Sequence, residues 1–266
     1  MEISRAAEVL NGQGIKAEIK KISKNGREMD AIVLGEGAVR PTAYQDSFSL
    51  LDDDEELVAF AKRLLKDMPD FDIQKIMTRD YVLGHVRSCV RHRTYCNDDV
   101  RFTVFGDLEE YFRIILDADP SGSIGSIVVR DEHIESLGIS PWELRSAGRA
   151  NLAQYAEISP MEAVLSELAG KDLPLQDTDK LMYVATAKDR MYGAGVMLLD
   201  SMLDGFCREH GLKSAYILPS SIHEIIVVDG RMDRQAVDSI IKDVNAECVK
   251  EHERLSDHSY RYSVAA

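Results

Sequence analysis

Alternation of apolar and polar residues in the first part of the chain predicts a β-hairpin. Ile15, Ala17 and Ile19 alternate with charged residues, as in a strand with one buried face. Residues 29–34 form a second apolar run, and Asn25-Gly26 between the two runs is the dipeptide that two-residue hairpin turns favour. The pattern therefore predicts two antiparallel strands joined by a tight turn.

Apolar residues recur at helical spacing in three other stretches. Residues 57–68 have acidic side chains before them and basic ones later, an order that complements the helix dipole, and Pro69 closes this helix. Residues 236–248 carry a clean amphipathic stripe. Residues 192–210 are largely apolar, which predicts one continuous helix.

Two serines carry the same helix-start chemistry. Ser140-Pro141 and Ser159-Pro160 each precede a glutamate in the spacing of a capping box. The serine hydroxyl can accept from an unpaired N–H of the first turn, and proline suits the first helical position. Helices should therefore begin near residues 141 and 160, and Gly170 should end the second.

The remaining apolar runs predict strands. They lie at residues 80–92, 111–116, 124–129, 181–185, 215–218 and 222–228, with Tyr260 and Tyr262 in a last edge strand. The first is ambiguous because Val82, Val86 and Val90 fit a helix as well as a strand, and their β-branching favours the strand. The last two runs flank a Pro-Ser-Ser break and predict a hairpin, in which Ile225 opens four β-branched residues typical of a strand buried on both faces.

Together these elements predict an α+β protein with mixed or antiparallel sheets and packed helices. The C-terminal part is predicted to form a strand–helix–hairpin–helix unit. The 266 residues suit an N-terminal region, 1–120, and a C-terminal region, 121–266, or one continuous domain.

Composition and charge narrow the class of protein. The chain is 45% hydrophobic, enough for a core, and its formal net charge of −14 would repel a nucleic-acid backbone. The basic stretch with Arg87, Arg91 and Arg93 on one strand face is interpreted as a solvated face rather than a nucleic-acid contact. No apolar run is long enough to span a bilayer, no secretory signal is recognised, and the four cysteines form no CxxC pair. We therefore expect a cytoplasmic, reduced protein with no membrane association.

The predicted C-terminal hairpin carries the densest cluster of functional groups, namely Ser220, Ser221, His223 and Glu224. These are the residue types of a nucleophile, a base and an orienting acid. On a strand, however, His223 and Glu224 point to opposite faces, and serines in a turn commonly bond the backbone. The cluster is thus either a site, in which Ser221 and His223 act with an acid from elsewhere, or a structural turn.

Other constellations favour structural interpretations. His85, Cys89, His92 and Cys96 have zinc-ligand residue types but share one stripe only on a helix, so no metal is expected. Gly193-Ala194-Gly195 follows a strand, yet the third glycine of a dinucleotide loop is missing, so we expect close helix packing and no cofactor. The acidic run 52–56 fits a solvated helix start, and Trp142 fits a packing anchor.

Several strings resemble those of a known family. They are KNG near residue 24, PTAY at 41–44, IVVRDEHIESLGIS before Trp142, MYVATAKDRMYGAGVMLL, and LPSSIHEIIVV with its PSSIHE motif. The chain resembles an uncharacterised family, a domain of unknown function of anaerobic gut Firmicutes often encoded near mobile-element genes. From residue 124 onward it is also similar to a second uncharacterised bacterial family with a Pro-His-acid turn in the equivalent hairpin. The resemblance implies no known activity, but it implies that PSSIHE and Tyr192–Gly195 are family features.

The function expected from these observations is that of a cytoplasmic, non-catalytic interaction or accessory protein with a protein partner and a link to mobile elements. The alternative is a hydrolase-type enzyme that uses Ser221 with His223. A pocket with His223 and a serine oxygen at its floor would favour the enzyme, and an exposed apolar patch would favour a partner surface.

Overall fold

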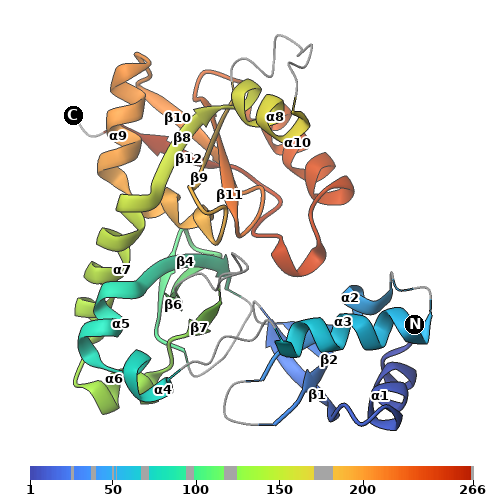
Figure 1. The fold of residues 1–266 in the computed structure, drawn as a ribbon. Helices are drawn as coiled ribbons and strands as arrows, with labels where there is room; N and C mark the ends of the chain where they lie inside the picture. The colour runs from blue at the N-terminus through green and yellow to red at the C-terminus, as the bar shows by residue number, and fades with distance from the viewer. Residues whose placement is uncertain are drawn as a thin grey trace. The chain divides into compact units, whose positions relative to one another are not determined.

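The computed structural model describes residues 1–24, 27–36, 40–49, 51, 53–66, 72–93, 99–116, 125–170 and 182–264. The chain divides into two compact units. Unit 1 comprises Met1–Ile76 and Asp117–Gly125, and unit 2 comprises Met77–Leu116 and Ser126–Ala266. Antiparallel sheets and helices build both units, which confirms the α+β class (Figure 1). None of the described helices is long and apolar enough to cross a membrane.

Unit 1 is a three-stranded sheet covered by helices. Its elements are α1 (Ile3–Gly12), β1 (Ala17–Lys24), β2 (Arg27–Leu34), β3 (Thr42–Tyr44), α2 (Gln45–Ser49), α3 (Asp54–Lys66) and α4 (Ile73–Ile76). The predicted hairpin is confirmed by the register of β1 and β2, which pairs Ala17 with Leu34, while its Asn25-Gly26 turn lies outside the described residues. Ile15 and Ala17 are buried as predicted, but Ile19 is 44% exposed because the buried face of β1 ends before it.

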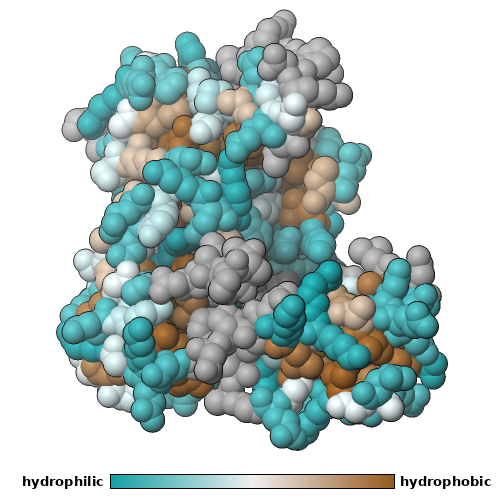
Figure 2. All heavy atoms as spheres, viewed as in Figure 1, coloured by the Kyte–Doolittle hydropathy of each residue, from teal (hydrophilic) through white to brown (hydrophobic). Residues whose placement is uncertain are grey.

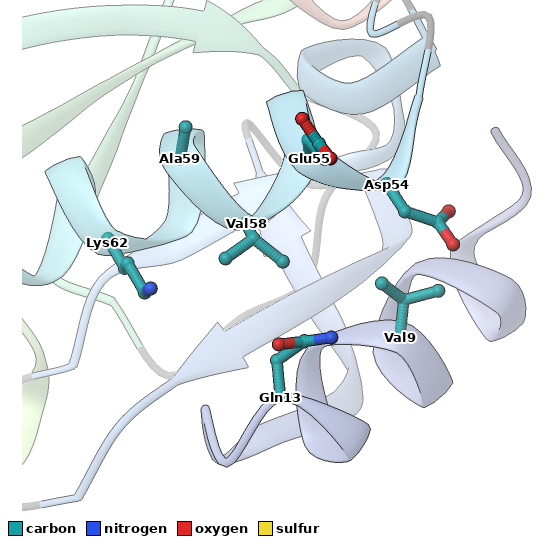
Figure 3. A pocket seen from close by; sticks show the side chains of 7 residues that line it. All are labelled: Val9, Gln13, Asp54, Glu55, Val58, Ala59 and Lys62. Atoms are coloured by element: carbon teal, nitrogen blue, oxygen red, sulfur yellow. The ribbon is translucent and has the colours of Figure 1, made fainter.

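A shallow groove of about 430 Å³ runs between α1 and α3. Val9 and Val58 point toward each other across it, and charged side chains such as Asp54 and Lys62 lie at its rim (Figure 3). Hydrophobic residues also show at the surface of unit 1 over these helices (Figure 2). The groove thus has a small apolar floor with polar side chains around its edge.

The first half of unit 2 contains a four-stranded sheet. Its elements are α5 (Arg79–His85), β4 (Val86–His92), β5 (Arg101–Val104), β6 (Leu108–Ile115), β7 (Ser126–Val128), α6 (Asp131–Leu137) and α7 (Pro141–Tyr155). β6 lies at the centre, with β4 on one side and β5 and β7 on the other. The strand predicted from residue 80 is wrong in its first half. A helix forms there because the Thr78 hydroxyl caps it and Tyr81 stacks on His85 one turn later.

The second half of unit 2 contains a five-stranded antiparallel sheet in the order β12-β10-β11-β9-β8 (Figure 1). Its elements are β8 (Ala156–Pro160), α8 (Met161–Ala169), β9 (Met182–Ala187), the 3₁₀ helix η2 (Gly193–Leu198), α9 (Asp200–Glu209), β10 (Ser214–Leu218), β11 (Glu224–Asp229), α10 (Arg234–Glu247), η3 (Glu251–Glu253) and β12 (Tyr260–Ser263). The predicted C-terminal hairpin, amphipathic helix and edge strand are all confirmed.

Both faces of this sheet are covered. Val237 and Ile241 of α10 pack on Tyr216, Leu218 and Ile226. The opposite face packs on η2 and α9, so the four β-branched residues from Ile225 are buried on both sides as predicted. The hydrophobic effect of these two layers therefore fixes the ends of β10 and β11, where the PSSIHE turn lies.

The helix predicted over residues 192–210 is interrupted. Residues 193–198 form η2, which is buried throughout, and α9 begins only at Asp200. Gly193 and Gly195 bring η2 so close to the backbones of β9 and β4 that side chains there would collide with them. This packing between two sheets, rather than helical propensity, sets the local conformation.

The two predicted capping boxes have different outcomes. The Ser140 hydroxyl accepts from the Glu143 N–H and begins α7 at Pro141. Ser159 caps nothing, because it lies in β8 opposite Val184 and Pro160 precedes the first residue of α8. α8 still begins at residue 161 and ends at Gly170, close to the prediction, but the strand partner has taken Ser159 out of the cap position.

Replacing Ser140 with alanine should lower the free energy of unfolding by about 1 kcal/mol, since one N–H of the first turn of α7 loses its acceptor. Ser159→Ala is the matched control and should stay within about 0.5 kcal/mol of wild type. Urea unfolding of both variants measures the difference. Equal losses in the two variants would contradict the assignment of Ser140 as the only cap of the pair.

Candidate functional site

The PSSIHE motif forms the turn between β10 and β11. Within it the Ser220 N–H donates to the Leu218 carbonyl at 3.0 Å, and the Ser221 N–H donates to the Glu224 carbonyl at 3.1 Å. The Ser221 hydroxyl oxygen accepts from the His223 N–H at 3.0 Å. Both serines are buried. Their hydrogen bonds hold the turn, so the Ser221 oxygen is already engaged with the backbone of the residue predicted to activate it.

The imidazole of His223 is held by residues outside the turn. Its Nδ1 accepts from the Tyr192 N–H at 3.3 Å, and its Nε2 lies 3.9 Å from a carboxylate oxygen of Glu253. Because Nδ1 is an acceptor, the proton of the neutral ring sits on Nε2 and points toward Glu253. The side chain remains 35% exposed. Tyr192 and Glu253, rather than Ser221, orient this ring.

Neighbouring elements fasten the turn. The Ile222 N–H donates to the Glu253 carbonyl at 2.9 Å, and the Ala194 N–H donates to the Ile222 carbonyl at 3.3 Å. The Thr186 hydroxyl donates to the His223 carbonyl at 2.8 Å. Glu224 opens β11 opposite Thr186 and is partly buried. The two strings implied to be family features, PSSIHE and Tyr192–Gly195, thus lie against each other.

The loop that carries Tyr192 has an unusual backbone. Arg190 and Tyr192 both have left-handed conformations, with φ of 58° and 52°, which non-glycine residues seldom adopt. Asp189 accepts from the Met191 N–H at 3.1 Å, and Arg87 donates to the Met191 carbonyl at 3.2 Å. Such conformations persist where surrounding contacts enforce them, and they are frequent at binding sites.

A charged face of the β4–β6 sheet lies beside this loop. The register places Arg87 opposite Arg113, Cys89 opposite Tyr111, and Arg91 opposite Glu109. Arg91 is only 2% exposed and donates to Asp99 at 2.7 Å and to Glu109 at 3.3 Å. The interpretation of this stretch as a solvated basic face is therefore wrong for Arg87 and Arg91. Both are buried, because Asp189 pairs with Arg87 and two carboxylates pair with Arg91.

Arg113 differs from the other two arginines of this face. Its Nε donates to the Ser126 hydroxyl at 3.0 Å, and its guanidinium lies 4.6 Å from the centre of the Tyr192 ring. Burial works against its charged form, but the neighbouring Tyr111, Tyr192 and Cys89 raise the pKa of Arg113 above its ordinary value. The site therefore carries a permanent positive charge next to Tyr192 and His223.

Residues 2–264 match the family described as "Family of unknown function (DUF5688)". The chain belongs to DUF5688. This confirms the resemblance to an uncharacterised family over nearly the whole length. No curated protein and no solved structure matches the chain. Membership of DUF5688 brings no assigned activity, so the site has to be interpreted from its own geometry.

In this DUF5688 chain the predicted zinc-type residues, the Gly193–Gly195 segment and the acidic run have structural positions. His85 ends α5 and its Nδ1 contacts the Tyr81 carbonyl, whereas Cys89 is buried in β4 and Cys96 lies outside the described residues. Across the part of the chain that the structure describes, no group of three or more histidines, cysteines or acids could hold a metal ion. Gly193-Ala194-Gly195 is buried between the sheets. Asp53 caps α3 by accepting from the Glu56 N–H at 2.8 Å, and Asp52 is not described.

Trp142 lies in the first turn of α7 with most of its side chain in solvent. The interpretation of Trp142 as a packing anchor is wrong, because 66% of it is exposed. Its ring lies 5.0 Å from that of Phe102, and the Arg145 guanidinium lies 4.3 Å from the Phe102 ring and 5.4 Å from the Trp142 ring. Trp142 is the second residue of α7, and it faces outward because the helix begins at the surface with Pro141. The Ser140 cap, which can be recognised in the sequence, already places Trp142 in the first turn of the helix.

The cysteines should differ sharply in reactivity. The thiolate is the reactive form, and burial raises the pKa of Cys89 to about 12. Iodoacetamide at pH 8 should therefore modify the exposed Cys248 and leave the buried Cys89 and Cys207 intact, as read by peptide mass spectrometry. Labelling in guanidinium is the control, since all three should then react. Modification of native Cys89 at the rate of Cys248 would contradict the buried face of β4.

Proposed function

We propose that this DUF5688 chain is a non-catalytic protein-binding protein, and that it binds its partner through the surface formed by Trp142, Phe102 and Arg145. The observation that carries the proposal is the 66% exposure of Trp142. Large aromatic rings gain free energy when they leave water, so an exposed one beside a second aromatic ring suits a recognition surface. Tryptophan and arginine are also the residues most enriched among interface hot spots.

This aromatic surface is ordered before any partner arrives. Arg145 lies over both rings while its Nε donates to the fully buried Glu110 at 2.8 Å, which fixes the guanidinium. Phe102 also contacts the buried Phe112 edge-on, with ring centroids 6.0 Å apart. A surface held in this way loses little conformational entropy on binding, which favours affinity.

Charge around the aromatic surface indicates the chemistry of the partner. Arg79 and Arg145 lie beside it with partly exposed side chains. Of their carboxylate partners, Glu110 is buried and Glu143 is exposed. Arg145 and Arg149 share the single carboxylate of Glu110, so positive charge is in excess beside this surface on a chain with a net charge of −14. The partner we propose is an acidic protein segment that presents an aromatic or proline side chain to Trp142.

The position of β5 supports an extended partner. β5 pairs only with β6 among the described strands, so it is an edge of its sheet, and its Phe102 contacts Trp142. An edge strand can accept another strand by backbone hydrogen bonding, while alternate side chains of the added strand reach the pockets beside it. A segment in this position would place its side chains over the aromatic surface.

The sole tryptophan makes this proposal directly testable. Acidic peptides selected from a display library against the intact chain should shift the Trp142 emission to shorter wavelength as they cover the ring. Trp142→Ala should weaken the selected peptides by about 30-fold or more, the loss of a hot spot. The exposed Ile19→Ala is the control and should bind them as wild type does. Selected peptides that bind Trp142→Ala with unchanged affinity would refute the assignment of this surface.

The hydrolase alternative with Ser221 and His223 stays a prediction, and the hydrogen bonds of the turn speak for a structural role. His223→Ala would leave the Tyr192 N–H without its acceptor and should cost about 1–3 kcal/mol. Ser221→Ala should cost less, since it loses one bond within a turn. Thermal melts of both variants measure this order. An unchanged or raised midpoint for His223→Ala would instead favour a catalytic role and justify assays with esters and phosphoesters.

A further inference from the structure

We infer that Arg113, Tyr192 and His223 form a binding site for a phosphate group. The three side chains stand in a row. The Arg113 guanidinium lies 4.6 Å from the centre of the Tyr192 ring, and the Tyr192 and His223 rings lie 5.6 Å apart. Each residue is partly buried, and none of the three is fully enclosed. This site is separate from the aromatic surface around Trp142 and does not depend on it.

The first reason is an unbalanced positive charge. Arg87 and Arg113 are directly opposite in the register of β4 and β6, and like charges at such positions repel. Asp189 neutralises Arg87 at 2.8 Å. Arg113, in contrast, has no carboxylate partner among the described residues, where it contacts the Ser126 hydroxyl, the Tyr111 side chain and the Tyr192 ring. A partly buried guanidinium without a counter-charge is suited to an anionic ligand.

The second reason is that the polar groups of the row are donors. The guanidinium of Arg113 donates only, and the Nε2 of His223 carries the ring proton because Nδ1 accepts from the Tyr192 N–H. The Tyr192 hydroxyl makes no hydrogen bond within the described part of the chain and can donate as well. Glu253, 3.9 Å from Nε2, limits the site on the His223 side, and Asp189, which pairs with Arg87, limits it on the Arg87 side.

The third reason is that the row is rigid. The left-handed conformations of Arg190 and Tyr192 place the Tyr192 ring, and Arg87 holds the loop through Asp189 and the Met191 carbonyl. Gly193 packs directly on the backbone of Ala187 and on the Thr186 hydroxyl, so the residue after Tyr192 has no freedom to move. Strained backbone that packing enforces is a common feature of binding sites.

Tetrahedral phosphate suits this arrangement better than a planar carboxylate. A carboxylate bound to the Arg113 fork has its remaining lone pairs in one plane, whereas a phosphate offers three or four oxygens in different directions. Free inorganic phosphate and the phosphate of a monoester share this chemistry. The experiment therefore includes inorganic phosphate and a phosphate monoester. A higher affinity for the ester would point to a phosphorylated small molecule as the ligand.

The test is calorimetric titration of the full chain with inorganic phosphate and with glycerol phosphate at constant ionic strength, with chloride as the reference anion. We expect saturable binding of at least one of the two phosphates. Arg113→Gln should weaken it by about 10-fold or more, because a charge-assisted interaction is lost. Arg261→Gln is the matched control, since Arg261 also contacts a serine hydroxyl and lies 5.7 Å from the centre of a tyrosine ring, that of Tyr216. This control should bind as wild type does.

Two further variants keep the inference falsifiable. Tyr192→Phe retains the ring beside Arg113 and loses only the hydroxyl, so it should fold normally and bind phosphate several-fold more weakly. Trp142→Ala should bind phosphate as wild type does, which separates this site from the proposed partner surface. Absence of saturable binding of either phosphate to the wild-type chain would overturn the inference, as would unchanged affinity in both Arg113→Gln and Tyr192→Phe.

Discussion

Replacing Gly195 with alanine is expected to destabilise unit 2 by about 3 kcal/mol or more, the upper range for overpacking a core. A Cβ at this position would lie 2.3 Å from the Ser88 carbonyl oxygen and 2.9 Å from a Leu152 methyl group. The Leu152 methyl could rotate away, but the carbonyl belongs to the backbone of β4, which hydrogen-bonds to β6 along its whole length. The new methyl group would therefore force η2 and β4 apart, and urea unfolding would measure the loss.

Gly205→Ala is the matched control for that prediction. Gly205 is exposed in α9, and a Cβ there would meet nothing within 4 Å. Alanine in an exposed helix position should stabilise by up to about 1 kcal/mol because it lowers the entropy of the unfolded chain. The two substitutions thus have the same chemistry and opposite expected signs. A Gly195→Ala protein as stable as Gly205→Ala would show that η2 does not pack against β4 as described.

The second large effect is expected for Arg91→Ala. Removing this side chain would leave Asp99 buried without its counter-charge, and Glu109 with only the partly exposed Arg101 at 3.7 Å. Breaking a buried ion pair on one side costs about 3–5 kcal/mol, far more than the pair contributes relative to an apolar replacement. The midpoint of chemical unfolding should fall accordingly.

Arg93→Ala provides the comparison within the same stretch of sequence. Arg93 is exposed and its guanidinium contacts only the Gly106 carbonyl among the described residues, at 3.1 Å. Its loss should stay within about 0.5 kcal/mol of wild type. A triple substitution of Asp99, Arg91 and Glu109 by apolar residues should recover part of the stability that Arg91→Ala loses, since no charge would then be stranded. Similar midpoints for Arg91→Ala and Arg93→Ala would contradict the buried position of Arg91.

Local patterns were sufficient for most elements of the fold. The hairpin of β1 and β2, the stripe of α10 and the buried run from Ile225 could be predicted because alternation and helical spacing report directly which face meets the core. The cap at Ser140 could also be predicted, because its hydrogen-bond partner lies only three residues away in the sequence.

Long-range partners account for what the patterns missed. Arg87 and Arg91 looked solvated because their sequence neighbours do not reveal the carboxylates that bury them, and Asp189 is 102 positions from Arg87. Ser159 has the same local motif as Ser140, but pairing of β8 with β9 overrode it. In the candidate site, Ser221 and His223 were found from the sequence, whereas Tyr192, Glu253 and Arg113 come from three other parts of the chain and could not be placed beside them.

The buried position of η2 also has a consequence for how the protein folds. η2 has little intrinsic stability as a short 3₁₀ segment, and its contacts lie on β4, β9 and β11, of which β4 is roughly a hundred residues earlier in the chain. Closing so long a loop is entropically costly, so docking of η2 should come late, after each sheet has formed its own hairpins. Refolding should accordingly be slow, and Gly195→Ala should speed unfolding more than it slows the folding step. A nascent chain released before η2 emerges would keep the η2 side of β4 in water, where it would be a target for chaperones.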